Sequence, residues 1–346
     1  MNIRKLVSWI AIFLVGVSVA VSCTPSPTAT SDPGASTAAS PAGEPVTIGF
    51  SAWPGWIPWQ VTQDKGIFEQ NNVKVDLKWF DGYLDSINAL AAGQLDGNSQ
   101  TLNDTISSMS GGADLVIVLT NDNSTGNDQI IAAEGINSIE DLRGKKVAAE
   151  EGTVDHFLLL LGLEQAGMTQ ADIEFQPLET GAAAAAFAAG QLDAVGVFAP
   201  FTTKALERPG SKALFTSKDF PGAISDHLVV SRQMVDDRPE EVQALVNSWF
   251  ATLKYIDDNK DETLTIMAKR GGVTEDEYKD YETGTTIFDI QENLKAMEAG
   301  SDMTSLPYAA DEISKFLVEA GLAQEAPDLS KLFDDRFIKA YAATAS

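Results

Sequence analysis

An eight-residue sequence occurs twice in this 346-residue chain, in two separate regions. Ala89–Asp96 reads Ala-Leu-Ala-Ala-Gly-Gln-Leu-Asp, and Ala186–Asp193 differs from it only by Phe at the second position. In each copy the glycine follows an alanine-rich segment, where a helix commonly ends at a residue that tolerates positive φ. The two copies therefore predict two helices that end in the same way.

Each copy lies between segments with the pattern of β-strands. Val73–Phe80 alternates apolar and polar residues before the first copy, and Ile173–Leu178 precedes the second. An apolar segment, Ala194–Phe198, follows the second copy. A strand-helix-strand unit joins parallel strands, so the repeat predicts two α/β lobes, each a mostly parallel sheet flanked by helices. Chance similarity of two alanine-rich helix endings is the alternative, and the repeated flanking strands argue against it.

The remaining segments complete the two lobes. We assign 46–122 to the first part of lobe 1, 123–227 to lobe 2, and 228–346 to the return to lobe 1 and the C-terminal helices. A buried strand at Leu115–Leu119 is expected to end in a polar loop. Two crossings, expected near Asn121–Gln129 and Asp226–Ser231, make a hinge, and a hinge between lobes makes a cleft.

The N-terminus has the pattern of an export signal. Two basic residues precede the apolar segment Leu6–Val21, which is too short for a stable membrane span, so 1–22 is assigned as a signal peptide. Cys23, the single cysteine, follows Ala-Val-Ser and resembles the lipidation site of bacterial lipoproteins. An ordinary secretory signal with an incidental cysteine is the alternative. Residues 23–45 are rich in Thr, Ser, Pro, Ala and Gly, which predicts a lipidated cysteine followed by a flexible tether.

Composition excludes several classes of partner and activity. A formal net charge of −26 disfavours nucleic acid and anionic lipid surfaces, since both require basic patches. We expect contact with the membrane only through the lipid anchor, and a monomer. The two histidines lie in separate segments, and the chain has no phosphate-binding loop, metal-ligand spacing or nucleophile motif. The sequence therefore predicts a binding protein without cofactor or metal, and not an enzyme.

Several short motifs follow one another along the chain: Ile48-Gly-Phe, Lys65-Gly-Ile-Phe-Glu, the repeated Ala-Ala-Gly-Gln-Leu-Asp, Leu142-Arg-Gly-Lys-Lys-Val and Gly152-Thr. Their order resembles that in the solute-binding proteins of nitrate-, sulfonate- and taurine-type ABC importers. The resemblance implies a type II-like, two-lobed periplasmic binding protein with two hinge crossings. It also implies export and an ABC permease and ATPase as partners.

Three further segments stand out: Ser51–Trp59, Trp79–Asp81 and Ser99–Thr105. They are similar to the urea-carboxylase-related subgroup of that family, which is linked to guanidine. The resemblance implies nitrogen uptake, with guanidinium as the ligand. A thiamine precursor is among the ligands of the wider family.

Ligands of open α/β sheets lie beyond the carboxyl ends of the strands, so the loops that follow the strands form the candidate site. These loops are rich in carboxylates and aromatic residues and contain no arginine. Ten of their residues form the candidate ligand-binding set: Trp53, Trp56, Asp81, Gln100, Asn103, Asp104, Glu151, Thr153, Phe198 and Asp226. Because guanidinium pairs with carboxylates and stacks on aromatic rings, this composition favours a small nitrogenous cation.

Each candidate has a structural alternative. Asp81, Asp104 and Asp155 could cap helices, whereas Trp53 and Trp56 bracket Pro-Gly and are expected to present an exposed aromatic face. The same fold could instead bind urea, a pyrimidine, nitrate, taurine or another sulfonate. A ligand-sensing or adhesion lipoprotein that transports nothing is a further alternative.

Overall fold

The structure is a computed structural model, and it describes residues 43–344. These residues fall within one compact unit, Ala39–Ser346. The predicted signal peptide, the lipidation at Cys23 and the tether up to residue 42 lie outside the described residues. No helix within 43–344 has both the length and the apolar character needed to cross a bilayer.

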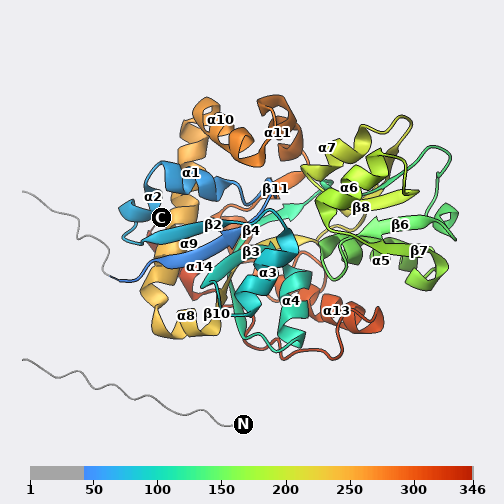
Figure 1. Cartoon of the computed structure of the whole chain (residues 1–346). Helices are drawn as coiled ribbons and strands as arrows, with labels where there is room; N and C mark the ends of the chain where they lie inside the picture. The colour runs from blue at the N-terminus through green and yellow to red at the C-terminus, as the bar shows by residue number, and fades with distance from the viewer. Residues whose placement is uncertain (1–42, 345–346) are drawn as a thin grey trace, which may run out of the picture. The chain divides into compact units, whose positions relative to one another are not determined.

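Sheet A contains six strands in the order β11-β4-β10-β3-β1-β2 (Figure 1). Their bounds are β1 (Val46–Phe50), β2 (Val75–Trp79), β3 (Gly97–Thr101), β4 (Leu115–Ser124), β10 (Ser225–Ser231) and β11 (Thr285–Ile287). Strand β1 pairs in parallel with β2 and β3, whereas β10 is antiparallel to β3 and β4.

Sheet B contains five strands in the order β7-β6-β8-β5-β9. Their bounds are β5 (Asp128–Ala132), β6 (Lys146–Ala149), β7 (Glu174–Pro177), β8 (Ala194–Phe198) and β9 (Lys212–Thr216). Strand β6 pairs in parallel with β7 and β8, and β5 is antiparallel to β8 and β9. The two sheets therefore share one pattern, in which β2-β1-β3-β10-β4 corresponds to β7-β6-β8-β5-β9.

Helices lie between and around the strands (Figure 1). Those before β10 are α1 (Pro58–Asp64), α2 (Ile67–Gln70), α3 (Tyr83–Ala91), α4 (Leu102–Ser110), α5 (Val154–Gln165), α6 (Thr180–Ala188) and α7 (Phe201–Leu206). Those after β10 are α8 (Arg232–Asp237), α9 (Pro239–Asp258), α10 (Lys260–Gly271), α11 (Glu275–Glu282), α12 (Ile290–Ala296), α13 (Leu306–Glu319) and α14 (Arg336–Thr344). The predicted α/β fold with two sheets flanked by helices is confirmed.

The repeated octet ends α3 and α6 in the same way. Gly93 and Gly190 have φ angles of 69° and 78°. The backbone N–H of the residue after each glycine donates to a carbonyl five residues earlier, from Gln94 to Ala89 and from Gln191 to Ala186, and this bond ends the helix. Asp96 then accepts hydrogen bonds from the amide and hydroxyl of Thr47 at 2.8 and 2.9 Å. Asp193 accepts from the amide of Lys146 at 2.9 Å. Each aspartate thus ties the end of the repeat to a strand that pairs in parallel with the strand after the repeat, β1 in sheet A and β6 in sheet B.

The chain passes between the sheets at two neighbouring places. Strand β4 runs to Ser124, so residues 120–124 are not the loop expected from the sequence, because β10 and β11 pair with both edges of this segment. Residues 125–127 then cross to β5. The return crossing precedes Ser225, since Asp226–Ser231 lies inside β10. The hydroxyl groups of Ser124 and Ser217 bond to each other at 2.7 Å and join the two crossings. The assignment of residues 123–227 to a second lobe stays a prediction.

The two aspartates that end the repeat should differ in their contribution to stability. Asp96→Ala removes two hydrogen bonds and is expected to lower the free energy of unfolding by about 1–3 kcal/mol. Asp193→Ala removes one hydrogen bond at a more solvated position, so it is expected to lower the free energy of unfolding by about half as much. Urea unfolding of both variants measures the difference, and an equal or reversed order would contradict the assigned roles.

Candidate functional site

A small cavity lies where the carboxyl ends of the parallel strands of both sheets meet. Its volume is about 10 Å³, close to the space of one water molecule. Residues from both sheets line it: Trp53, Trp56, Tyr83, Thr101, Asp128, Val154, Phe198, Ile224 and Asp226. The position agrees with the rule that ligands of open α/β sheets lie beyond the carboxyl ends of the strands.

Four aromatic rings form a closed series around the cavity. Trp53 contacts Trp56 with ring centroids 6.4 Å apart, and Trp56 contacts Tyr83 at 5.1 Å. Phe198, from sheet B, completes the series by contacting Tyr83 at 6.0 Å and Trp53 at 6.3 Å. Trp53 and Trp56 are only 3% and 2% exposed. The expected exposed aromatic face was therefore wrong, because the opposite sheet covers these rings.

Six buried carboxyl groups surround the cavity or lie directly behind it: Asp104, Asp122, Asp128, Glu150, Asp155 and Asp226. Sheet A and its helix α4 supply three of them, and sheet B and its helix α5 supply the others. No ion pair with Lys, Arg or His holds any of the six among residues 43–344. These residues also contain no group of His, Cys, Asp or Glu side chains that could hold a metal ion.

Strand register places two of these carboxyl groups directly beside each other. Asp226 on β10 is opposite Asp122 on β4 and opposite Thr101 on β3. Like charges directly opposite one another in an antiparallel pair destabilise the sheet. Asp122 accepts from the Nε1 of Trp53 at 2.9 Å through one oxygen. Its other oxygen and both oxygens of Asp226 receive no hydrogen bond from any other group in the described part of the chain. The two carboxyl groups are close enough to hydrogen-bond to each other when one of them carries a proton.

Burial raises the pKa values of the carboxyl groups on the sheet A side. The pKa of Asp122 rises to about 8 and that of Asp104 to about 7, in both cases because burial disfavours the charged form. The pKa of Asp226 lies well above its ordinary value, first through burial and then through repulsion by Asp122 and Asp128. A proton on either Asp122 or Asp226 relieves the repulsion within this pair.

The carboxyl groups on the sheet B side behave in the same way. Burial raises the pKa of Asp128 to about 7, and repulsion by Asp104 across the cavity adds to this. Burial also raises the pKa of Glu150 to about 7, and that of Asp155 well above its ordinary value. The hydroxyl of Thr180 contacts both of the latter, at 3.1 Å to Glu150 and 2.7 Å to Asp155.

The nearby histidine supplies no positive charge. His227 is fully buried in β10 between Thr120 and Ser225, whose hydroxyl groups lie 3.2 and 2.9 Å from its two ring nitrogens. Burial lowers the pKa of His227 to about 3, so the imidazole is neutral at physiological pH. The site therefore combines aromatic faces with acidic groups that have no basic partner in the described chain.

Gly55 permits the close approach of the aromatic loop to Asp122. A Cβ atom at this position would lie 1.9 Å from an oxygen of Asp122. Any side chain at residue 55 would therefore displace the carboxyl group or the Trp53–Trp56 loop. The Pro-Gly sequence between the two tryptophans thus has a steric role that sequence analysis did not assign.

The structure brings most of the ten candidate residues into this region. Trp53, Trp56, Phe198 and Asp226 line the cavity itself. Four others are buried beside it: Gln100, Asn103, Asp104 and Thr153. Glu151 is exposed.

Asp81 lies apart from the cavity, at the exposed end of β2. It accepts a hydrogen bond from the Nε1 of Trp79 at 2.9 Å. The guanidinium of Arg270 lies over the same indole, 3.8 Å from the ring centroid, and Asp81 favours the charged form of that arginine. The guanidinium of Arg270 thus lies over an aromatic ring and near a carboxylate, without a hydrogen bond or ion pair to that carboxylate in the described part of the chain.

Contrary to the structural alternative, Asp81, Asp104 and Asp155 are not the N-cap residues of helices α3, α4 and α5. The N-cap of α3 is Gly82 rather than Asp81. Asp104 accepts from the hydroxyl of the N-cap residue Thr101 at 2.8 Å, and Asp155 accepts from Thr180 on α6. Neither carboxyl group therefore caps its own helix, although the Asp104 carboxyl also accepts from the backbone amide of Val154, the first residue of α5.

Besides Thr101, Val154 and Ile224, which also line the cavity, the candidate set lacked Tyr83 and four of the buried carboxyl groups, Asp122, Asp128, Glu150 and Asp155. Tyr83 and these four lie in the loops that follow the predicted strands, so their positions in the sequence were a signal. The burial of Asp122 depends on the pairing of β10 and β11 with β4, which sequence periodicity does not reveal.

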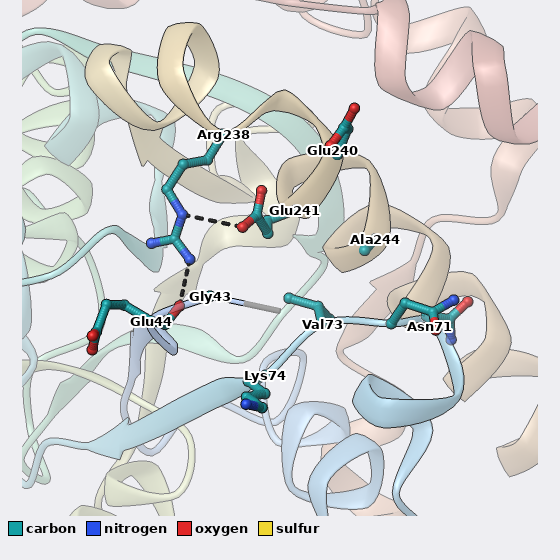
Figure 2. Close-up of a pocket in the computed structure, with 10 residues that line it drawn as sticks. Gly43, Glu44, Asn71, Val73, Lys74, Arg238, Glu240, Glu241 and Ala244 are labelled. Carbon is teal, nitrogen blue, oxygen red and sulfur yellow. Dashed lines mark hydrogen bonds and ion pairs between the residues drawn. The ribbon is translucent and has the colours of Figure 1, made fainter. Parts of the chain in front are cut away.

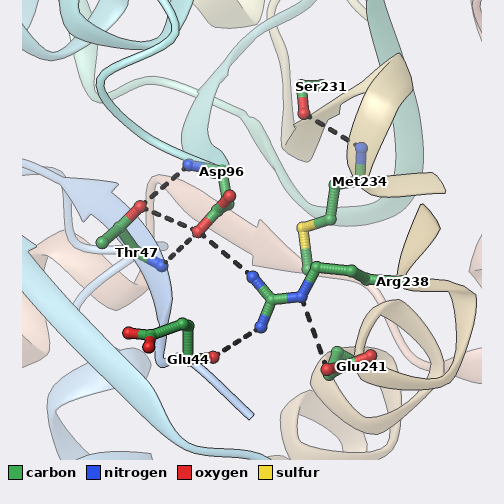
Figure 3. Close-up of polar contacts among 7 residues, drawn as sticks. All are labelled: Glu44, Thr47, Asp96, Ser231, Met234, Arg238 and Glu241. Atoms are coloured by element: carbon green, nitrogen blue, oxygen red, sulfur yellow. Dashed lines mark hydrogen bonds and ion pairs between the residues drawn. The ribbon is translucent and has the colours of Figure 1, made fainter. Parts of the chain in front are cut away.

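A larger cavity, of about 260 Å³, lies at the opposite end of β1 and β2, beside Arg238 (Figure 2). The guanidinium of Arg238 already donates to the carbonyl of Glu44 at 2.7 Å and to Glu241 at 3.4 Å, and lies 3.7 Å from Asp96 (Figure 3). All three of its nitrogens therefore have partners within the protein. This network fixes the start of β1 and offers no free charge to a ligand.

The two sheets, with the cavity at their junction, define the fold of two-domain periplasmic binding proteins. The crystal structure of the periplasmic aliphatic sulphonate binding protein from Escherichia coli has a TM-score of 0.70 with this structure at 23% identity. That alignment covers 85% of this chain and 93% of that one.

Residues 39–270 match the NMT1-like family, and the chain belongs to that family. A protein of Brucella abortus (strain 2308) named as a binding protein is 30% identical over 239 residues, covering 65% of this chain and 71% of that protein. The taurine-binding periplasmic protein of Escherichia coli (strain K12) is 24% identical over 293 residues, covering 82% of this chain and 89% of that protein. These relatives are named as binding proteins, and the absence of enzymatic activity stays a prediction.

The raised pKa values should make the ligand-free protein less stable as pH rises. Between about pH 4 and pH 8 these carboxyl groups bind more protons in the folded protein than in the unfolded chain, and they outnumber the two buried histidines, which bind fewer, so the free energy of unfolding falls with increasing pH. Each excess proton contributes about 1.4 kcal/mol per pH unit. Urea unfolding at pH 5, 6, 7 and 8 measures the slope.

Asp122→Asn is the variant that tests the origin of this slope. It removes one group with a raised pKa and should flatten the loss of stability between pH 5 and pH 8. A free energy of unfolding that is constant or increases over this range in the unmodified protein would contradict the assignment.

Proposed function

We propose that this protein is the extracytoplasmic substrate-binding component of an ABC importer, and that it captures guanidinium or a closely related small nitrogenous cation. The observation that carries the proposal is the group of buried carboxyl groups without a basic partner, set against four aromatic rings. The site would hold the cation between the two sheets by carboxylate pairing and stacking.

The charge of the site supports a cation over an anion. Both oxygens of Asp226, one of Asp122 and one of Asp128 are buried in the described chain with no donor other than a proton shared between Asp122 and Asp226. Guanidinium carries donors that match paired carboxylate oxygens and a planar face that stacks on indole rings. Nitrate or the sulfonate end of taurine would meet the same oxygens at the cost of repulsion and would need basic groups for compensation.

The dimensions of the site support a small ligand. A cavity of about 10 Å³ requires modest movement of its walls to admit a planar ion of four heavy atoms. A sulfonate has a tetrahedral head and an additional carbon chain, so it would require a larger separation of the aromatic rings. Urea matches guanidinium in shape but lacks the charge.

The Arg270 arrangement supports the proposed chemistry from within the same molecule. Its guanidinium stacks on Trp79 at 3.8 Å beside a carboxylate. Trp53 and Asp122 are hydrogen-bonded to each other, and they would offer a bound ligand the same combination of an indole ring and a carboxyl group.

The named relatives support the importer role. They include periplasmic binding proteins for taurine and, in the solved structure, for aliphatic sulphonates. Export follows from this role, and lipidation of Cys23 would keep the protein at the outer face of the cytoplasmic membrane. A permease and an ATPase would be its protein partners.

Isothermal calorimetry on the purified chain tests the ligand class. Guanidinium chloride should bind, whereas sodium nitrate, taurine and urea should show much weaker binding or none. Asp226→Asn removes a buried charge that faces the ligand and should weaken guanidinium binding by about 2–5 kcal/mol.

Asp81→Asn is the matched control, because Asp81 is exposed and bonded to Trp79. It should leave the affinity for guanidinium within about twofold of that of the unmodified protein. Tight binding of taurine or nitrate without binding of guanidinium would refute the cation proposal and leave the importer role intact.

A further inference from the structure

One hydroxyl pair connects helices that belong to different sheets. The hydroxyl of Tyr281 on α11 lies 2.5 Å from the hydroxyl of Thr203 on α7. Helix α7 packs on β8 and β5 of sheet B, whereas α11 contacts β11 of sheet A. Figure 1 shows α11 and α7 facing each other across the region between the two sheets.

The turn after α11 is held to the first crossing segment by a second set of bonds. The side-chain Nδ2 of Asn127 donates to the backbone carbonyl of Tyr281 at 2.5 Å and to the hydroxyl of Thr285 at 2.8 Å. The amide of Thr125 donates to the carbonyl of Gly284 at 2.9 Å. A Cβ atom on Gly284 would lie 2.5 Å from Asn127, so glycine is required for this close packing.

The second set of bonds is adjacent to carboxyl groups of the cavity. Asn127 immediately precedes Asp128, which lines the cavity from sheet B. In strand β11, Ile287 is directly paired with Asp122 on sheet A. The turn at residues 281–285 is therefore connected to one cavity carboxyl group on each side.

From these contacts we infer that Thr203 and Tyr281 form a closure latch, positioned by Asn127 and Thr285, which holds the two sheets together around the ligand and sets its rate of release. The inference rests on the proposed capture of a ligand between the sheets and adds the residues that control how long it stays. None of the four supplies a charge to the cavity, so each is a positioning residue.

The latch has a physical task that follows from the site. Asp104 repels Asp128 across the cavity, and Asp226 is repelled by Asp122 and Asp128. Without a cation this repulsion favours separation of the sheets. A neutral hydrogen bond outside the cavity stabilises the closed arrangement without adding charge to it.

Stopped-flow tryptophan fluorescence with guanidinium chloride tests the latch. Tyr281→Phe and Thr203→Val each remove one hydroxyl and should raise the dissociation rate constant about fivefold, with the association rate constant within about twofold. The double variant should match either single variant, since all three lose the same bond. Tyr255→Phe is the control, because its hydroxyl bonds Glu262 at the surface and should leave both rates unchanged.

A second readout does not depend on the identity of the ligand. Spin labels at Lys254→Cys on α9 and Glu174→Cys on β7, in a Cys23→Ser background, report the separation of the sheets by double electron–electron resonance. Tyr281→Phe should shift the ligand-free distribution toward longer distances.

The outcomes separate the latch from the proposed ligand. An unchanged distance distribution together with unchanged rates, or rate effects that add in the double variant, would overturn the latch. Absence of guanidinium binding in the unmodified protein would refute the proposed ligand. The effect of Tyr281→Phe on the ligand-free distance distribution would then still test whether the latch exists.

Discussion

Mutual repulsion among buried carboxyl groups is the constraint on which the site depends. Asp122 and Asp226 are direct cross-strand neighbours, and Asp104 and Asp128 face each other from different sheets. Burial removes the water that would otherwise solvate them, and the described chain supplies no basic partner. The folded protein can carry these groups in two ways, by keeping protons on them or by binding a cation.

The repeated architecture explains how so many acidic groups reach one place. Each sheet has the same strand order, and each directs its parallel strands toward the junction. The octets ending at Asp96 and Asp193 fix the opposite ends of these strands, so the junction ends are free to carry polar residues. Stability is therefore concentrated at one end of each sheet, and the destabilising acidic groups lie at the other.

Much of this could be predicted from the sequence, and the failures have physical causes. Gly93 and Gly190 act locally, so the repeat predicted both strand-helix-strand units and the edge at which the site lies. Asp122 was missed because its polar segment becomes a strand only through pairing with β10 and β11. Asp81 was included because its position after a strand does not reveal that Arg270, far along the chain, lies over the neighbouring indole.

Carbon-13 NMR of the aspartate carboxyl groups tests the central claim most directly, with Asp→Asn variants providing the assignments. In the ligand-free protein the Asp122 resonance should titrate near pH 8, and those of Asp104 and Asp128 near pH 7. Saturating guanidinium should move the Asp122 midpoint to lower pH, because a bound cation favours the carboxylate. Ordinary midpoints near pH 4 in the free protein, or midpoints that guanidinium leaves unchanged, would contradict the account.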